Sequence, residues 1–334
     1  IQGESVAGEH TVIQIPELGL NFDMGSCPRW ALAAGVTAIS HGHMDHIGGL
    51  PYYFSQRHFQ GMGVGTVVCP PSLVIPLRDM MKSWIALERQ RTPFELVGLA
   101  PGEEWELKPD VFLRPFETSH TVPSQGYCVV EKRKKLKPEF HGLSQEQLKA
   151  LRSGGTQITD IHEHIHVAYT GDTQLCPALM HPDVATAKVV ITECTFFAAD
   201  ERKRAGAGKH LHVEDLRTLL STWESDCVVA IHLSRRSNIQ LAREELDRIP
   251  ERSPISKHLP ANRTDRLMRG RVISGQGKHH RFRQRPMAIA VQGDVAFEVP
   301  TQGRAGQLQH DQPIEQPAKQ VGHQQLPAIG KRRC

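Results

Sequence analysis

Three histidines and an aspartate that could bind metal ions lie within one short segment, Ser-His-Gly-His-Met-Asp-His at 40–46. The candidate ligands are His41, His43, Asp45 and His46. His41 and His43 are two positions apart, so their imidazoles point the same way on an extended chain. Asp45 and His46 follow from a turn, so the segment offers two adjacent ligand sets. Mixed imidazole and carboxylate ligands favour a transition metal, zinc first. Two metals roughly 3.5–4 Å apart are the arrangement that hydrolyses phosphate esters.

Further polar candidates come directly after predicted strands. His120 follows strand 111–117 in a loop rich in Ser, Thr and Pro, where it is well placed as another ligand. Asp172 lies between Gly171 and Thr173 after strand 167–170, and one carboxylate can bridge two cations. Glu193 follows a buried strand at 188–192. Strands that alternate with helices and end in ligands predict an α/β protein with its site along one edge of the sheets.

Other segments have less specific patterns. Asp23, in a turn between strands, could support a ligating histidine or simply close the turn. The apolar stripe of helix 73–89, which includes Trp84 and Leu87, is predicted to be core. Residues 200–212 are a charged, glycine-punctuated segment, predicted to be a loop.

Charge is unevenly distributed. Residues 252–334 hold 15 Lys and Arg against 5 Asp and Glu, so residues 1–251 hold 25 against 31. The basic balance therefore comes from the tail, and only local clusters such as Lys-Arg-Lys-Lys at 132–135 bear on nucleic-acid binding. We predict one hydrolase domain at 1–251, followed by a tail at 252–334 that is low in complexity or disordered, with non-native sequence as the alternative.

The cysteines and the apolar runs bear on location. Seven cysteines without a C-x-x-C pair indicate reduced thiols in a cytoplasmic compartment. There is no apolar run of about 18 residues, so no transmembrane helix is predicted.

With these residues in view, the chain resembles the metallo-β-lactamase superfamily, and within it the short-form ribonuclease Z (tRNase Z) enzymes of the plant type. The resemblance runs from about residue 3 to residue 250. The motifs that carry it are SHGHMDHIGGLPYY, RPFETSHTVPSQGY, AYTGDT, ITECTF, KHLHVEDL and HLSRR, together with the insert KRKKLKPEF…QITDI. The family's last strand is not recognisable after Ile249, and the basic insert stands where many members have a longer arm.

The resemblance implies a four-layer αβ/βα sandwich with two zinc ions, or manganese or iron, at the edge between the sheets. It implies that one metal is held by His41, His43 and His120, the other by Asp45, His46 and His232, with Asp172 as the bridge. The implied reaction is removal of the 3′ trailer from precursor tRNA, and the implied assembly is a homodimer.

The implied mechanism gives roles to further residues. Asp45 would orient the attacking water and act as general base. His212 would protonate the leaving 3′ oxygen, with Glu193 holding its ring, although His210 competes for this role. Contacts to RNA phosphates are expected from Ser234, Arg235, Arg236, Lys132, Arg133, Lys134 and Lys135.

Two other interpretations compete with this one. The same metal site could serve a hydrolase that acts on a small phosphodiester, sulfate or lactone. Alternatively, the unusual tail could come from a damaged gene and leave a protein that binds metal without activity.

Overall fold

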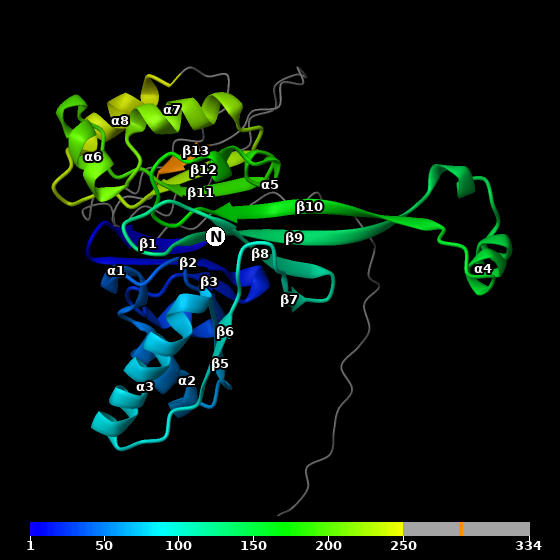
Figure 1. The fold of residues 1–334 in the computed structure, drawn as a ribbon, viewed down its shortest axis with the longest axis horizontal. Helices are drawn as coiled ribbons and strands as arrows, with labels where there is room; N and C mark the ends of the chain where they lie inside the picture. The colour runs from blue at the N-terminus through cyan, green and yellow to red at the C-terminus, as the bar shows by residue number, and fades with distance from the viewer. Residues whose placement is uncertain (250–286, 290–334) are drawn as a thin grey trace, which may run out of the picture. The chain divides into compact units, whose positions relative to one another are not determined.

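Two β-sheets packed face to face between helical layers form the part of the chain that the computed structural model describes, residues 1–249 and 287–289 (Figure 1). The first sheet has the order β1-β2-β3-β4-β5-β6 and the second β13-β12-β11-β10-β9-β8-β7. The strands of the first sheet are β1 (Gln2–Val6), β2 (His10–Ile15), β3 (Leu20–Phe22), β4 (Val36–Ala38), β5 (Gly65–Cys69) and β6 (Phe94–Gly98). Those of the second are β7 (Trp105–Lys108), β8 (Val111–Glu117), β9 (Gln125–Leu136), β10 (Thr159–Tyr169), β11 (Val189–Glu193), β12 (Cys227–Ile231) and β13 (Met287–Ile289).

Most of the helices cover the outer faces of the two sheets, whereas α4 lies away from both of them (Figure 1). They are α1 (Met44–Ile47), α2 (Leu50–Phe59), α3 (Val74–Glu88), α4 (Gln145–Ser153), α5 (Pro182–Ala185), α6 (Arg202–Gly208), α7 (Val213–Thr222) and α8 (Ile239–Asp247). Leu50 and Tyr53 of α2 and Leu77 of α3 pack on the first sheet. Leu216 of α7 and Leu246 of α8 pack on the second. The predicted α/β class and the four-layer sandwich are therefore confirmed.

A third apolar cluster fills the space between the sheets. It combines Phe22 of the first sheet with Tyr127, Tyr169 and Ile191 of the second, all of them buried. The rings of Phe22 and Tyr169 stack with their centroids 4.7 Å apart. Phe22 is the last residue of β3 and Tyr169 is the last residue of β10. Their stacking therefore fixes the distance between the sheet edges on which the candidate ligands lie.

Parallel pairing brings the ligand-bearing strand ends together. β3, β4 and β5 are parallel neighbours, as are β10, β11 and β12. The carboxyl ends of neighbouring parallel strands meet at one edge of a sheet, and ligands bind in the crevice outside them.

The strands β9 and β10 continue beyond the sheet as a two-stranded arm that carries α4 near its end (Figure 1). Their pairing runs out to Leu136 and Thr159, whereas β8 accompanies β9 only as far as Glu131. The basic run at 132–135 therefore lies on this arm. Arg114 of β8 anchors its root, since it pairs with Glu163 of β10 and Asp183 of α5, both at 2.8 Å.

Two local predictions were wrong. Helix α3 buries Leu77 and Met81 but leaves Trp84 43% and Leu87 74% exposed, so its apolar stripe is only partly core. The segment 200–212 is not a loop throughout, because it contains α6, whose first residue Arg202 forms a bidentate ion pair with Asp215.

The strand β13 lies within the segment predicted to be a tail. Its residues 287–289 pair in parallel with β12, which supplies a last strand that the sequence pattern did not reveal. The remainder of that tail, residues 252–286 and 290–334, lies outside the described residues. In the described ranges no helix is long and apolar enough to cross a membrane.

Candidate metal centre

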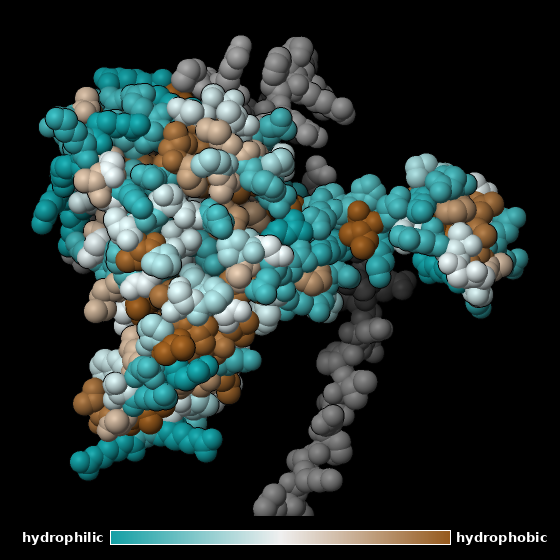
Figure 2. All heavy atoms as spheres, viewed as in Figure 1, coloured by the Kyte–Doolittle hydropathy of each residue, from teal (hydrophilic) through white to brown (hydrophobic). Residues whose placement is uncertain are grey.

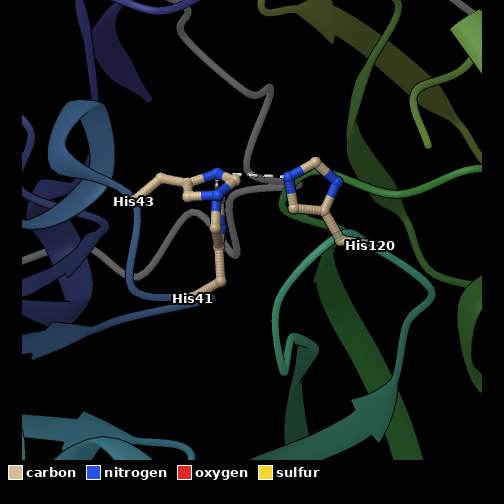
Figure 3. Close-up of side chains that lie close together, drawn as sticks. All are labelled: His41, His43 and His120. Atoms are coloured by element: carbon tan, nitrogen blue, oxygen red, sulfur yellow. Dashed lines mark hydrogen bonds between the residues drawn. The ribbon is translucent and has the colours of Figure 1, made fainter. Parts of the chain in front are cut away.

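Three imidazoles from two separate segments face one another at the sheet edge (Figure 3). His41 and His43 follow β4, and His120 lies in the loop between β8 and β9. His43 Nδ1 is 3.0 Å from His41 Nε2 and 3.2 Å from His120 Nε2. Three nitrogens at this spacing suit a single ion bound at about 2.0–2.1 Å from each.

A second group lies beside the first. Asp45 Oδ2 is 3.7 Å from His46 Nε2 and 3.5 Å from His232 Nε2. Both of these Nε2 atoms are buried, and neither has a hydrogen-bond partner among the described residues. Buried polar atoms without partners are costly, so their arrangement around a carboxylate fits a cation at this position.

Asp172 connects the two groups. Its Oδ2 atom lies 3.9 Å from His41 Nε2, 3.3 Å from His46 Nε2 and 3.2 Å from His232 Nε2. The predicted ligands from four places along the chain therefore converge, and the position of Asp172 fits a bridging carboxylate.

The protonation states of the cluster favour cation binding. Burial, with the neighbouring imidazoles, lowers the pKa of His41 to about 2, so its ring is neutral. Burial alone would raise the pKa of Asp172, but His232 and His46 hold it well below its usual range, so the carboxylate is ionised. Burial opposes protonation of His46, yet Asp172 and Asp23 raise its pKa. The same negative field would attract a divalent cation in place of that proton.

A fully buried carboxylate, Asp23, sets the orientation of two candidate ligands. His46 Nδ1 lies 2.7 Å from Asp23 Oδ2, and His41 Nδ1 lies 3.0 Å from Ser40 Oγ, which donates to Asp23. Tyr169 also donates to this carboxylate. Since Asp23 can only accept, the Nδ1 atoms carry the protons and the Nε2 lone pairs point into the cluster. Asp23 therefore lies where the first of its two interpretations needs it, beside histidines that are candidate ligands.

Glu193, the last residue of β11 in the second sheet, is a second fully buried carboxylate that supports candidate ligands. Its Oε2 accepts from the Thr195 hydroxyl at 2.6 Å, and Thr195 Oγ1 lies 3.1 Å from His232 Nδ1. Sequence reasoning did not identify Ser40, Tyr169 or Thr195 as supports. The only available signal was their position beside ligands in the motifs SHGHMDH, AYTGDT and ITECTF.

The prediction that Glu193 holds the ring of His212 was wrong. His210 Nδ1 lies 2.9 Å from Glu193 Oε1 and 4.0 Å from Asp172 Oδ2. The His212 ring instead caps α7, since its Nδ1 accepts from the Glu214 amide at 3.3 Å and its Nε2 donates to the Ala198 carbonyl at 3.0 Å. Burial lowers the pKa of His210, but the Glu193 carboxylate outweighs this effect and raises it to about 9.

The predicted phosphate contacts lie in two places. Ser234, Arg235 and Arg236 follow His232, and both arginines are exposed. Of the four residues on the arm, Lys132 pairs with Glu104, and Arg133 pairs with Glu131 at 2.6 Å. Lys134 and Lys135 are exposed, and no carboxylate in the described part of the chain forms an ion pair with either of them.

Comparison with known proteins agrees with this geometry. The family model described as the Beta-lactamase superfamily domain matches residues 31–233. The crystal structure of the metallo-beta-lactamase fold protein YhfI from Bacillus subtilis is similar, with a TM-score of 0.53 and 13% identity over 74% of this chain and 92% of that one. At that identity it supports the fold alone.

Two plant relatives are much closer in sequence. The chain is 34% identical over 248 residues to the Arabidopsis thaliana protein "tRNase Z TRZ2, chloroplastic", covering 73% of this chain and 70% of that protein. It is 33% identical over 256 residues to "tRNase Z TRZ1" of the same plant, covering 75% and 90%. The chain therefore belongs to the metallo-β-lactamase superfamily and, within it, to the tRNase Z (ribonuclease Z) family.

Proposed function

We propose that the protein is a metal-dependent endoribonuclease that removes the 3′ trailer from precursor tRNA. The observation that carries this proposal is that two groups of candidate ligands lie side by side, with the Asp172 carboxylate next to members of both. The groups are His41, His43 and His120, and Asp45, His46 and His232. Such a ligand set suits hydrolysis of phosphodiesters. The names of the two plant relatives support tRNA as the substrate.

Two zinc ions are the proposed cofactors, with manganese or iron as alternatives. His41, His43 and His120 would hold one ion and Asp45, His46 and His232 the other, with Asp172 shared. When bound, the ions would supply positive charge that stabilises the phosphate oxygens and makes a water acidic enough to attack near neutral pH.

Within this proposal, two side chains move protons. Asp45 orients the attacking water and accepts its proton. His210 donates a proton from Nε2 to the leaving 3′ oxygen, because its Nδ1 is occupied by Glu193. The products are a tRNA with a 3′-hydroxyl and a trailer with a 5′-phosphate. A cytoplasmic location is proposed from the cysteines, which are free wherever they are described.

The decisive experiment incubates the zinc-loaded protein with a precursor tRNA and, in parallel, with bis(p-nitrophenyl) phosphate, and maps the RNA cut. Cleavage at the trailer junction supports the proposal. Cleavage of the small ester alone would favour a hydrolase of small substrates. Zinc near two equivalents without either activity would favour a protein that only binds metal.

His210→Ala is expected to lower kcat on precursor tRNA by about 10²–10⁴-fold, the usual contribution of a general acid. The matched control is His212→Asn, because an asparagine oxygen can accept from the Glu214 amide and keep the helix cap. Single-turnover cleavage measures both variants. Loss of turnover in His212→Asn with turnover retained in His210→Ala would reverse the assignment.

Asp23→Asn is expected to weaken zinc binding by about 10–100-fold, because the amide can no longer accept hydrogen bonds from all its buried neighbours. Asparagine tolerates the left-handed backbone at this position, where φ is 56°. Asp110→Asn is the control, since Asp110 is exposed and has a φ of 63°. Chelator competition compares the two, and equal zinc affinities would exclude the supporting role of Asp23.

The arm is proposed to contact RNA phosphates through Lys134 and Lys135. Replacing both by alanine should raise KM for precursor tRNA and reduce the slope of log KM against log salt by about one for each phosphate that is no longer neutralised. Lys82→Ala, on the exposed side of α3, is the control. If both variants show the parent's KM and slope, the arm does not bind these phosphates.

We also propose a homodimer through the apolar surface of α2 and α3. Trp84 and Leu87 of α3 and Tyr52 and Phe59 of α2 are exposed, and the Ser55 hydroxyl of α2 donates to the Glu88 carboxylate of α3. Several hydrophobic residues, drawn in brown, reach the surface over this part of the molecule in Figure 2. Adjoining exposed apolar side chains of this size are typical of an interaction surface. A second copy can bury such a face against itself.

Trp84→Glu is expected to convert the dimer to a monomer, because burying the new carboxylate at the interface is costly. Ile161→Glu is the control, since Ile161 is 60% exposed on the arm. Light scattering over a range of concentrations measures the mass of each form. A parent protein that stays monomeric throughout would contradict the proposal.

A further inference from the structure

The turn between β1 and β2 reaches the metal-ligand cluster from the edge of the first sheet. The amide of Gly8 donates to Asp45 Oδ2 at 2.8 Å, although the two residues are 37 positions apart. Gly8 has a φ of 73°, which side-chain-bearing residues rarely adopt. A glycine is therefore needed here to keep the turn in this conformation.

The hydrogen bond is made to the oxygen that faces the candidate ligands. Asp45 Oδ2 is the same atom that lies 3.5 Å from His232 Nε2 and 3.7 Å from His46 Nε2. A backbone amide bound to a carboxylate is a short, strong contact that restricts the carboxylate's rotation. The Gly8 amide thus limits which way Asp45 can point.

The same turn is also tied to the loop that follows β12. Ala7 donates its amide to the Leu233 carbonyl at 3.3 Å, and the buried Ser5 hydroxyl accepts from the His232 amide at 3.1 Å. His232 itself has a φ of 65°, an uncommon backbone for a histidine. These hydrogen bonds hold His232, with its uncommon backbone conformation, against β1.

An ion pair extends this connection to the basic residues. Glu9 Oε1 lies 2.6 Å from Arg235 Nε, and the two side chains are 38% and 60% exposed. Because Glu9 engages Nε, the two terminal nitrogens of the guanidinium stay available for a phosphate. Glu9 therefore restrains Arg235 without occupying the whole guanidinium.

We infer that the β1–β2 turn is a wall of the active site, in which the Gly8 amide positions Asp45 and Glu9 positions Arg235. The part concerning Arg235 rests on the proposed function, because it presumes a phosphate-bearing substrate. The part concerning Gly8 requires only that Asp45 binds a metal ion, so it can be tested separately.

Gly8→Ala tests the first part in the full zinc-loaded chain. Its matched control is Gly63→Ala, since Gly63 is also exposed, has a φ of 81° and likewise has open space for a methyl group. Both variants should lose a similar amount of thermal stability from the strained backbone. Gly8→Ala alone should weaken binding of one zinc ion by about tenfold, as mutations behind metal ligands do.

Zinc affinity, measured by chelator competition, is the readout that does not depend on activity. Turnover of bis(p-nitrophenyl) phosphate is the second readout, and Gly8→Ala should lower kcat rather than raise KM. If the two glycine variants bind zinc equally and turn over equally, the proposed role of the Gly8 amide is excluded. A parent that binds zinc but cleaves no RNA would refute the tRNA proposal and leave the zinc test intact.

Glu9→Gln tests the second part. It should raise KM for precursor tRNA by about threefold, a modest effect because exposed ion pairs are weak. Asp79→Asn is the control, since it removes a comparable exposed ion pair, with Lys82, on α3. Equal KM values for the two variants would show that Glu9 does not position Arg235.

Discussion

Two fully buried carboxylates, Asp23 and Glu193, are the constraint on which the rest of the site depends. Asp23 lies at the end of β3 and orients His46 directly and His41 through Ser40. Glu193 ends β11 and orients His210 directly and His232 through Thr195. A buried charge is tolerated only where hydrogen bonds satisfy it, so each carboxylate requires its histidines as much as it orients them.

Because Asp23 and its hydrogen-bond partners depend on one another, the distance between the two sheets is also fixed. Asp23 belongs to the first sheet, yet it accepts a hydrogen bond from Tyr169 of the second. The ring of Tyr169 stacks on Phe22, the residue before Asp23. The apolar core and the polar site therefore share a side chain, so the packing between the sheets also sets the separation of the two ligand groups. Closely packed interiors transmit such constraints with little slack.

The sequence predicted which side chains meet at the sheet edge, because the segments that carry them follow strands with clear apolar patterns. The sequence-based prediction failed where the direction of a side chain, not its position in the chain, decided which partner it contacts. His210 and His212 are two residues apart, but Lys209 is left-handed with a φ of 51° and His212 caps α7, so only His210 turns toward Glu193. Trp84 and Leu87 follow a helical period correctly, yet periodicity cannot tell a core from an exposed apolar face. Strand β13 lies in an apolar stretch of the sequence at 287–299, and it was missed because the polar sequence around that stretch was interpreted as a disordered tail.

Under the proposed function, the arm and the metal centre would carry out two separate physical tasks. The carboxylates and imidazoles of the cluster suit cations at short range, and carboxylates occupied by cations give little attraction for a polyanion at long range. Under the proposed function, the exposed lysines on the arm would supply that long-range attraction. The root of the arm is held by Arg114, which joins Glu104, Glu163 and Asp183. An arginine with three carboxylate partners is less free to move than one in a single exposed pair, so the arm's direction is set by the body of the protein. Under the proposed function, the lysines that would attract the substrate and the residues that would act on its phosphate are therefore held in a fixed relation by one folded unit.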